Sequence, residues 1–402
     1  MEICNNLECT GCMACLDICK HNAIKQVIDK NGFVFPKIDK EKCVSCKQCQ
    51  KICPVNNQYK NTKSSIVLAC WNNSKKIRIS SSSGGVFFLL AEAVIKSGGI
   101  VYGAALNENL YIEHQRITSL SDIKNIQGSK YVQSNTKGIF KLVKNDLEND
   151  KIVLFSGTPC QVSGLKTYIN KKYPKLICID LVCHGVPSPQ LFTDYIHYIT
   201  QKYNKPPKNI IFRYKKPNWT VFSMKIDFVN KQSYISSKFN DPYLSFFLSD
   251  LSLRPSCFYC KFSTEERAGD ITLGDFWNFK ALQFDQRSIE KGVSLVILST
   301  LKGKQLFNHI SCNLYMKECN WIDAHNSNQS LSRPWKKPEN YEEFWEDYKN
   351  KCFEDLQIKY CTQQQLEKQF LKESWKRAHY YLINFMGLKR FINFFKGKIK
   401  CK

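Results

Sequence analysis

Hydrophobic and polar positions along the first sixty residues follow the pattern of a short β-hairpin. Two runs rich in apolar residues, at 23–28 and 33–38, flank an Asp-Lys-Asn-Gly segment at 29–32. Asn-Gly between two such runs favours a tight turn that joins antiparallel strands. The stretch at 56–65 is polar and has no apolar period, so we interpret it as a linker.

Beyond the linker, strand-like and helix-like patterns alternate. Apolar runs typical of strands occur at 66–71, 100–106, 151–155 and 176–181. Patterns typical of helices occur at 86–96 and 161–168, and Gly98 follows the first of these where a helix would end. This alternation predicts an α/β core with a largely parallel or mixed sheet. Further strands are expected at 210–214, 221–229 and 233–235.

Composition narrows the class of protein. The 402 residues include 59 Lys and Arg against 35 Asp and Glu, a formal charge of +24, and 43% of them are hydrophobic. So much apolar material forms a packed core, which excludes a disordered tail and a disulfide-held mini-scaffold. The sequence begins without a basic and apolar leader, and no apolar run approaches the roughly 20 residues that span a bilayer. We therefore expect a cytoplasmic protein, whose 20 cysteines point to metal and not to disulfides.

Eight of the cysteines form two copies of one spacing, C-x2-C-x2-C-x3-C, within the first sixty residues. In bacterial ferredoxins this run gives three thiolates to one cubane cluster and the fourth to another, whereas structural zinc sites use paired C-x2-C. The spacing therefore predicts two 4Fe-4S clusters. The first is expected on Cys9, Cys12, Cys15 and Cys53, and the second on Cys43, Cys46, Cys49 and Cys19. Lys20 stands where a proline usually follows the first run, and Cys4 lies outside the pattern.

Four further cysteines lie in loops beside glycine or proline: Cys160, Cys183, Cys257 and Cys260. Thiolates from three loops can make a tetrahedral site for a third 4Fe-4S cluster or for zinc, and unliganded thiols are a further alternative. His184 follows Cys183 and is a candidate catalytic proton donor, because the pKa of histidine lies near neutrality. A structural hydrogen-bonding role is the alternative for this histidine.

Three loops of small residues stand at the ends of expected strands or helices. They are 80–85, which opens into the helix at 86, then 128–131, and 157–160, which follows a strand. Small residues at a helix N-terminus leave backbone N–H groups free to hold phosphate, and ligands of α/β sheets sit beyond the carboxyl ends of strands. Each loop, taken singly, is equally well explained as a turn with an N-cap. The chain has no G-x-G-x-x-G, so a Rossmann dinucleotide site is not supported.

The order of these motifs carries a resemblance. They are Ser81-Ser82-Ser83-Gly84-Gly85, Gly128-Ser129-Lys130-Tyr131, Gly157-Thr158-Pro159-Cys160, Cys183-His184-Gly185, Cys257-x2-Cys260 and Gly274-Asp275-Phe276-Trp277. Over about residues 66–310 the sequence resembles the family of the coenzyme F420 hydrogenase/dehydrogenase beta subunit, some members of which are fused to an N-terminal dicluster ferredoxin.

The resemblance implies an iron–sulfur flavoprotein oxidoreductase. Such a protein binds FAD and passes electrons between a one-electron, ferredoxin-like carrier and a two-electron organic or coenzyme acceptor. The resemblance also implies that the second cysteine set holds a cluster near the flavin. Candidate FAD contacts are Ser82, Ser83, Gly84, Gly85, Gly128, Ser129, Lys130, Tyr131, Gly157, Thr158 and Pro159. A non-catalytic iron–sulfur electron-transfer subunit of a larger redox complex is the alternative, and the family does not fix the substrate.

The end of the chain differs from the rest in charge. Residues 374–402 hold eight Lys and Arg, no acidic residue and several aromatic residues. This pattern predicts a basic amphipathic helix, suited to an anionic membrane face, to an acidic partner or to packing on its own domain; no nucleic-acid module accompanies it. The expected organisation is a small dicluster ferredoxin domain at 1–60, a mixed-sheet α/β flavin-binding domain at 66–320 and a helical, basic C-terminal extension at 321–402.

Overall fold

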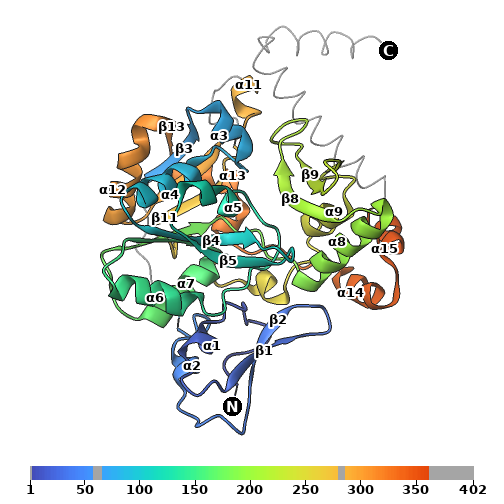
Figure 1. Cartoon of the computed structure of the whole chain (residues 1–402), viewed down its shortest axis with the longest axis horizontal. Helices are drawn as coiled ribbons and strands as arrows, with labels where there is room; N and C mark the ends of the chain where they lie inside the picture. Colours follow the sequence, from blue (N-terminus) through green and yellow to red (C-terminus); the bar gives the residue numbers. More distant parts are fainter. Residues whose placement is uncertain (1, 58–65, 279–285, 362–402) are drawn as a thin grey trace, which may run out of the picture.

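The computed structural model describes residues 2–57, 66–278 and 286–361, and Figure 1 shows how their elements are arranged. Most of the expected linker and the whole basic segment 374–402 lie outside the described residues. Within the described part of the chain, no helix has both the length and the apolar character needed to cross a membrane.

The N-terminal unit is built on the hairpin that the sequence predicts. Its Asp29 carboxylate accepts hydrogen bonds from the backbone N–H groups of Asn31 (3.0 Å) and Phe33 (2.8 Å). Gly32 closes the turn with a φ of 79°, a conformation that glycine adopts without steric cost. Local chemistry thus fixes the antiparallel pairing of the two strands. The elements of the unit are α1 (Ala14–Ile18), β1 (Ile24–Ile28), β2 (Val34–Ile38) and α2 (Gln48–Lys51).

An eight-stranded mixed sheet forms the centre of the larger domain, in the order β13-β3-β12-β11-β7-β6-β4-β5. The strands β4, β6, β7 and β11 run parallel to one another, and the outer pairs are antiparallel. The expectation of a mixed α/β sheet is confirmed. The strands are β3 (Ile66–Asn72), β4 (Ile100–Leu106), β5 (Ile112–Ile117), β6 (Val153–Gly157), β7 (Leu176–Leu181), β11 (Ile271–Asp275), β12 (Ser294–Leu298) and β13 (Leu314–Cys319).

Helices cover both faces of this sheet, because its central strands are apolar on both sides. On β6, Leu154 packs into the core beneath α4 and α12, whereas Val153 and Phe155 pack beneath α6 and α7. This alternation is what a period of two along a strand requires. The helical elements of this domain are α3 (Lys75–Ser80), α4 (Val86–Lys96), η1 (Leu120–Asp122), α5 (Ile123–Ile126), α6 (Ile139–Glu148), α7 (Pro159–Ile169), α11 (Gln286–Ile289), α12 (Leu301–Ile310), η3 (Ser311–Asn313), α13 (Trp321–Ser327) and η4 (Gln329–Leu331).

A second layer lies beside the large sheet and has its own aromatic core (Figure 1). A three-stranded antiparallel sheet in the order β10-β9-β8 packs with α8 and α9, and α14 and α15 close the same core. The helices α14 and α15, which fall within the expected C-terminal extension, are therefore packed into the molecule. The elements of the layer are α8 (Pro189–Tyr203), β8 (Pro207–Tyr214), β9 (Ser223–Phe228), β10 (Ser233–Ser237), α9 (Pro242–Leu248), η2 (Pro255–Tyr259), α14 (Tyr341–Asn350) and α15 (Phe353–Tyr360).

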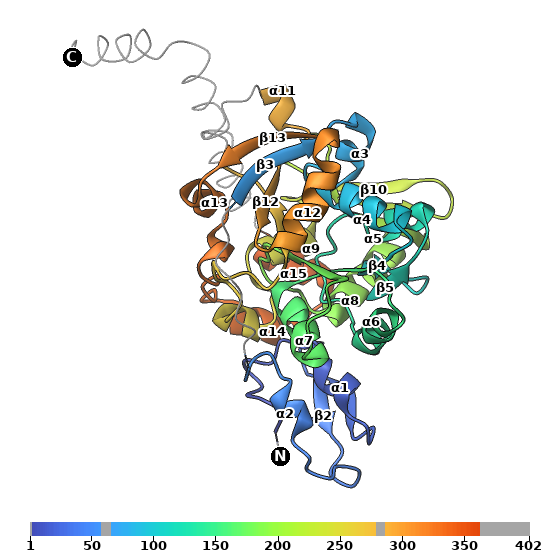
Figure 2. The ribbon, with the colours of Figure 1, turned by 90° about the vertical axis from the view of Figure 1, so that its left-hand side faces the viewer.

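The N-terminal unit docks against both parts of the larger domain. Its helix α1 lies against α6 and α7, as Figure 2 shows. The Asp17 carboxylate accepts hydrogen bonds from the backbone N–H groups of Gly138 (2.8 Å) and Phe140 (3.1 Å). At the hairpin, the fully buried Phe33 joins the aromatic layer, with its ring 5.4 Å from that of Trp345. Both α1 and the hairpin therefore hold the unit directly against the larger domain.

Candidate functional site

The first predicted cysteine set comes together in the N-terminal unit. Cys12 interacts electrostatically with Cys9 and Cys53, and Cys15 interacts with all three. All four side chains are buried. Burial raises the pKa of the Cys15 thiol well above its usual value, because a buried thiolate without a partner is poorly solvated. A buried set of this kind suits a cationic iron core, which would neutralise the thiolates.

The second predicted set surrounds a small hollow on the same unit. Cys19, Cys43, Cys46 and Cys49 all line that hollow. The pseudo-symmetry of the two runs is visible in the backbone, because equivalent positions take the same left-handed conformation. The equivalent pairs are Gly11 (φ 66°) with Ser45 (φ 54°) and Met13 (φ 59°) with Lys47 (φ 59°).

Cys4 lies close to the first set, although its position in the sequence gave no signal of this. Its side chain is within hydrogen-bonding reach of Cys9 and Cys53. The Cys4 contact is the main cause that lowers the pKa of Cys9 to about 6 and that of Cys53 to about 7. Cys4 therefore belongs to the surroundings of the first set.

The four cysteines of the larger domain also converge, from three separate elements. Cys160 lies in the first turn of α7, Cys183 follows β7, and Cys257 and Cys260 lie at η2. Cys183 interacts electrostatically with the other three, and Cys257 interacts with Cys160 and Cys260. Burial raises the pKa of Cys160 to about 11 and that of Cys257 to about 12. We call these residues the second-domain cysteine set.

The second-domain cysteine set adjoins the first ferredoxin set. Cys12 and Cys160 interact electrostatically. Gly164 on α7 lies so close to Cys12 that a Cβ at this glycine would come within 2.9 Å of the Cys12 Sγ. The Thr136 hydroxyl also donates a hydrogen bond to the Cys12 carbonyl (2.9 Å). Tight packing therefore brings the two sets into neighbouring positions.

A large cavity of about 840 Å³ lies between the sheet and the aromatic layer. The segment 181–186, which carries Cys183 and His184, forms part of its wall. The other walls include all three loops of small residues that the sequence singled out. Predicted residues that line the cavity are Ser82, Ser83, Gly85, Gly128, Ser129, Lys130, Tyr131, Gly157, Thr158 and His184.

Two predicted contact residues do not line the cavity. A Cβ at Gly84 would lie 2.4 Å from the Cys70 carbonyl oxygen, so this glycine lets the loop pack against β3. Pro159 is buried in the first turn of α7. Both residues shape the loops that form the wall.

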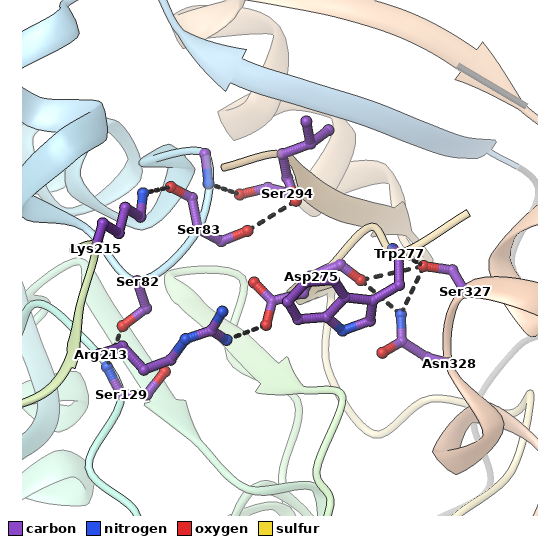
Figure 3. Close-up of polar contacts among 12 residues, drawn as sticks. Ser82, Ser83, Ser129, Arg213, Lys215, Asp275, Trp277, Ser294, Ser327 and Asn328 are labelled. Carbon is purple, nitrogen blue, oxygen red and sulfur yellow. Dashed lines mark hydrogen bonds and ion pairs between the residues drawn. The ribbon is translucent and has the colours of Figure 1, made fainter. Parts of the chain in front are cut away.

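Hydrogen bonds hold the loops 80–85 and 128–131 to each other and to the sheet (Figure 3). The Ser82 hydroxyl accepts a hydrogen bond from the Ser129 N–H (2.7 Å), and the Ser83 hydroxyl donates to the Val293 carbonyl (2.8 Å). Lys215 donates to the Ser83 carbonyl (2.6 Å), and burial lowers the pKa of this lysine to about 6. The loops are therefore preorganised.

The helix α4 begins at the cavity with an open N-terminus. Its N-cap is Gly85, which has a φ of 88° and no side chain to cap the first turn. At α7, by contrast, the Gln161 side chain accepts a hydrogen bond from the Thr158 N–H (3.0 Å). Free N–H groups at the end of an eleven-residue helix favour an anionic group such as a phosphate.

Arg213 and Asp275 form a buried ion pair on the cavity wall that the sequence patterns did not predict as a site (Figure 3). The guanidinium lies over the rings of Phe222 (4.5 Å) and Trp277 (5.4 Å). Its Nε and Nη2 atoms form no hydrogen bond of good geometry with any described residue. A single arginine on a strand gives no local signal, because its role depends on a partner 62 positions away.

His184 is held in place by a carboxylate. Its Nε2 lies 2.5 Å from Asp250 Oδ1, and its ring packs on Trp335 (4.6 Å) and Phe247 (5.0 Å). The imidazole is thus oriented at the cavity wall, one residue from Cys183. The structure fits either of the two roles that the sequence left open.

Two family models match parts of this chain. Residues 8–57 match the family model of the 4Fe-4S dicluster domain. Residues 150–323 match the model of the C terminus of the coenzyme F420 hydrogenase/dehydrogenase beta subunit. The F subunit of the F(420)H(2) dehydrogenase of Methanosarcina mazei is 24% identical over 199 residues, which are 45% of this chain and 55% of that protein. The match thus spans about half of the length of the curated relative.

A solved structure was also found to be similar. It is a chain of the F420-reducing [NiFe] hydrogenase complex from Methanosarcina barkeri, with 15% identity and a TM-score of 0.45. The similarity covers 64% of this chain and 83% of that chain.

The molecule is an iron–sulfur protein with a dicluster 4Fe-4S domain at its N-terminus. Residues 150–323 of its larger domain match the C-terminal domain of the coenzyme F420 hydrogenase/dehydrogenase beta subunit, so the resemblance seen in the sequence is confirmed over this range.

Proposed function

We propose that this chain is an iron–sulfur flavoprotein subunit that relays electrons between a one-electron, ferredoxin-like carrier and a two-electron organic acceptor. The observation that carries the proposal is the continuity of the three sites. The ferredoxin set adjoins the second-domain cysteine set at Cys12 and Cys160, and the latter set shares the segment 181–186 with the cavity.

The cavity fits FAD in size and in chemistry. Its volume of about 840 Å³ lies in the upper part of the range for cofactor sites. The open N-terminus of α4 at Gly85 would hold a phosphate, and Phe87, Ile126 and Trp277 offer apolar surface for a ring system. A bound flavin would accept electrons singly and deliver them as a pair. The residues that would hold it are Ser82, Ser83, Gly85, Gly128, Ser129, Lys130, Tyr131, Gly157 and Thr158.

A 4Fe-4S cluster fits the second-domain cysteine set better than a zinc ion does. The four thiols share a neighbourhood, but no three His, Cys, Asp or Glu side chains of the described residues stand close enough to hold a single ion. The thiolates around a cubane cluster are farther apart than those around one ion. Cys160, Cys183, Cys257 and Cys260 are therefore the proposed ligands of a third cluster.

His184 is the residue best placed to move a proton at the cavity wall. Asp250 holds its Nε2, which leaves Nδ1 for a group in the cavity. A carboxylate in this position fixes the orientation of the ring. We propose that His184 donates a proton to the organic acceptor.

Other subunits are expected beside this chain. The curated relative is named as one subunit of a dehydrogenase. We propose that this chain likewise works in a complex of the F420 hydrogenase/dehydrogenase type, in the cytoplasm, with the basic segment 374–402 as a contact for an acidic partner or a membrane face. No nucleic acid is expected as a partner.

The experiment is cofactor analysis of the full chain, purified and reconstituted without oxygen. Three clusters predict about twelve irons per chain, together with FAD released on denaturation. About eight irons and one zinc would contradict the third cluster, and a chain that binds iron but no flavin would contradict the flavoprotein.

A glycine pair tests where the flavin binds. Gly128 (φ 85°) lines the cavity, whereas Gly98 (φ 73°) has the same backbone strain and does not line it. We expect Gly128→Val to lower FAD occupancy at least about tenfold through steric exclusion, at unchanged iron content. Gly98→Val is the matched control. Equal FAD loss in both variants would show that strain, and not the cavity, is responsible.

A further inference from the structure

Arg254 is fully buried where the N-terminal unit meets the larger domain. Its Nε donates a hydrogen bond to the Cys9 carbonyl (2.8 Å), and its Nη1 donates to the Val34 carbonyl (3.0 Å) and to the Gln133 side chain (2.9 Å). The guanidinium also lies 3.9 Å from the centre of the Phe35 ring. Most of these contacts are to the N-terminal unit, although Arg254 belongs to the larger domain.

The backbone of Arg254 is tied to the second-domain cysteine set. Its N–H donates to the Val186 carbonyl (2.9 Å), and its carbonyl accepts from the Cys257 N–H (2.9 Å). The guanidinium interacts electrostatically with both Cys9 and Cys257. One positive charge therefore lies between the first ferredoxin set and the second-domain cysteine set.

This charge has no carboxylate partner among the described residues. Two other buried arginines do: Arg213 pairs with Asp275, and Arg267 lies 3.3 Å from Asp180. The Nη2 atom of Arg254 also forms no hydrogen bond within the described part of the chain. An unpaired buried charge is costly, so a neutralising group is required.

We propose that Arg254 is the shared counter-charge of the clusters on the two cysteine sets, and that it raises the reduction potential of both. A cubane with four thiolates is negatively charged, and each one-electron reduction adds a further negative charge beside the guanidinium. Arg254 therefore favours the reduced form on both sides of the domain junction. For the Cys257 side, the inference rests on the proposed third cluster; for the Cys9 side, it rests only on the dicluster domain.

The test is a redox titration of the full reconstituted chain, followed by electron paramagnetic resonance. We expect Arg254→Met and Arg254→Gln to lower the equilibrium constant for reduction of the Cys9 cluster about tenfold. For one electron, this corresponds to a reduction potential about 59 mV lower. The cluster on the second-domain set should shift in the same direction. Arg254→Lys should shift both reduction potentials much less, because lysine retains the positive charge.

Two controls separate charge from damage to the fold. The cluster on Cys43, Cys46 and Cys49 should keep its reduction potential in every variant. Arg116→Met is the second control: it removes an arginine that pairs with Asp146, and it should leave the potentials of all clusters unchanged. Wild-type potentials in Arg254→Gln would overturn the proposal, because this change removes charge but can keep a hydrogen bond.

Iron content covers the case in which a variant does not assemble. Loss of iron in Arg254→Met and Arg254→Gln, with retention in Arg254→Lys, supports a need for the charge. Loss in Arg254→Lys as well would overturn the proposal, since charge alone would then not suffice. If the proposed third cluster does not exist, the unsubstituted chain will hold about eight irons. This outcome is distinct from any effect of the Arg254 variants.

Discussion

The two kinds of cysteine site in this molecule are built in opposite ways. In the ferredoxin-like unit, each run places three cysteines within seven residues, and left-handed residues such as Met13 and Lys47 turn the backbone around the site. The second-domain cysteine set takes its members from α7, the loop after β7, and η2, which are up to a hundred residues apart. One site is encoded by local backbone geometry, and the other exists only when the sheet, the helices and the aromatic layer are assembled.

This difference predicts different responses to perturbation. A local site should tolerate changes elsewhere in the fold, whereas an assembled site should depend on the packing of every element that reaches it. Four experiments test the contrast, in order of decreasing effect.

The largest effect is expected from loss of one proposed ligand of the assembled site. Cys257→Ala should lower iron from about twelve to about eight per chain, because three thiolates from separate elements hold a cubane poorly. Iron analysis with a spectrum of each cluster checks this. Cys312→Ala removes an exposed cysteine and is the control. Retention of all iron in Cys257→Ala would contradict the assignment.

The next effect concerns the junction between the two sites. Gly11 and Ser45 are equivalent positions, but a Cβ at Gly11 would lie 2.2 Å from the Gln133 side chain. Gly11→Ala should therefore lower the free energy of unfolding by about 1–3 kcal/mol through overpacking. Urea unfolding of the holoprotein measures this. Ser45→Gly, at the exposed equivalent position, removes a Cβ from the same left-handed backbone and measures the backbone cost alone. A loss in Gly11→Ala no larger than the gain in Ser45→Gly would place the cost in the backbone and not in the junction.

A pH effect on stability is expected from a histidine of the cavity wall. Burial lowers the pKa of His114 to about 4, below its usual value near 6.5. The unfolded chain therefore binds this proton first as the pH falls, so stability is complete above pH 6.5 and decreases below it. At pH 5.5 the loss should be about 1.4 kcal/mol relative to pH 7.5.

The control for this pH effect is His114→Gln, which cannot take up the proton. Its stability should change less between pH 7.5 and pH 5.5 than that of the unsubstituted chain, by about the same 1.4 kcal/mol. Parallel pH profiles for the two proteins would show that His114 is not the group responsible.

The smallest effect is expected in the hairpin. Asp29→Ala removes an acceptor for the N–H groups of Asn31 and Phe33 and should cost about 0.5–1.5 kcal/mol, with full iron content. Asp39→Ala, which removes one exposed contact to the Glu41 N–H (3.2 Å), is the matched change. Thermal unfolding and iron analysis test the pair. Loss of iron in Asp29→Ala would mean that the ferredoxin site is not locally encoded.

Much of the fold followed from local patterns. The hairpin around Asn31-Gly32 and the α4 helix at 86–96 lie where periodicity and turn chemistry predict them. The strand β5, by contrast, has charged and polar residues such as Glu113 and Arg116 along it, and the sequence patterns did not predict it. It is an edge strand, and pairing with β4, not its own apolar content, makes it a strand.

The sequence alone determined the chemistry that depends on spacing. Two cysteine runs predict two clusters, because three ligands of each cluster lie so close in the chain that they can reach it whatever surrounds them. Only the tertiary structure decided which distant groups meet. It brought Arg213 to Asp275 on the cavity wall, and it buried Arg254 between the two kinds of cysteine site. Such contacts depend on the packing of whole elements, and an isolated arginine in a sequence carries no sign of the partner that packing will give it.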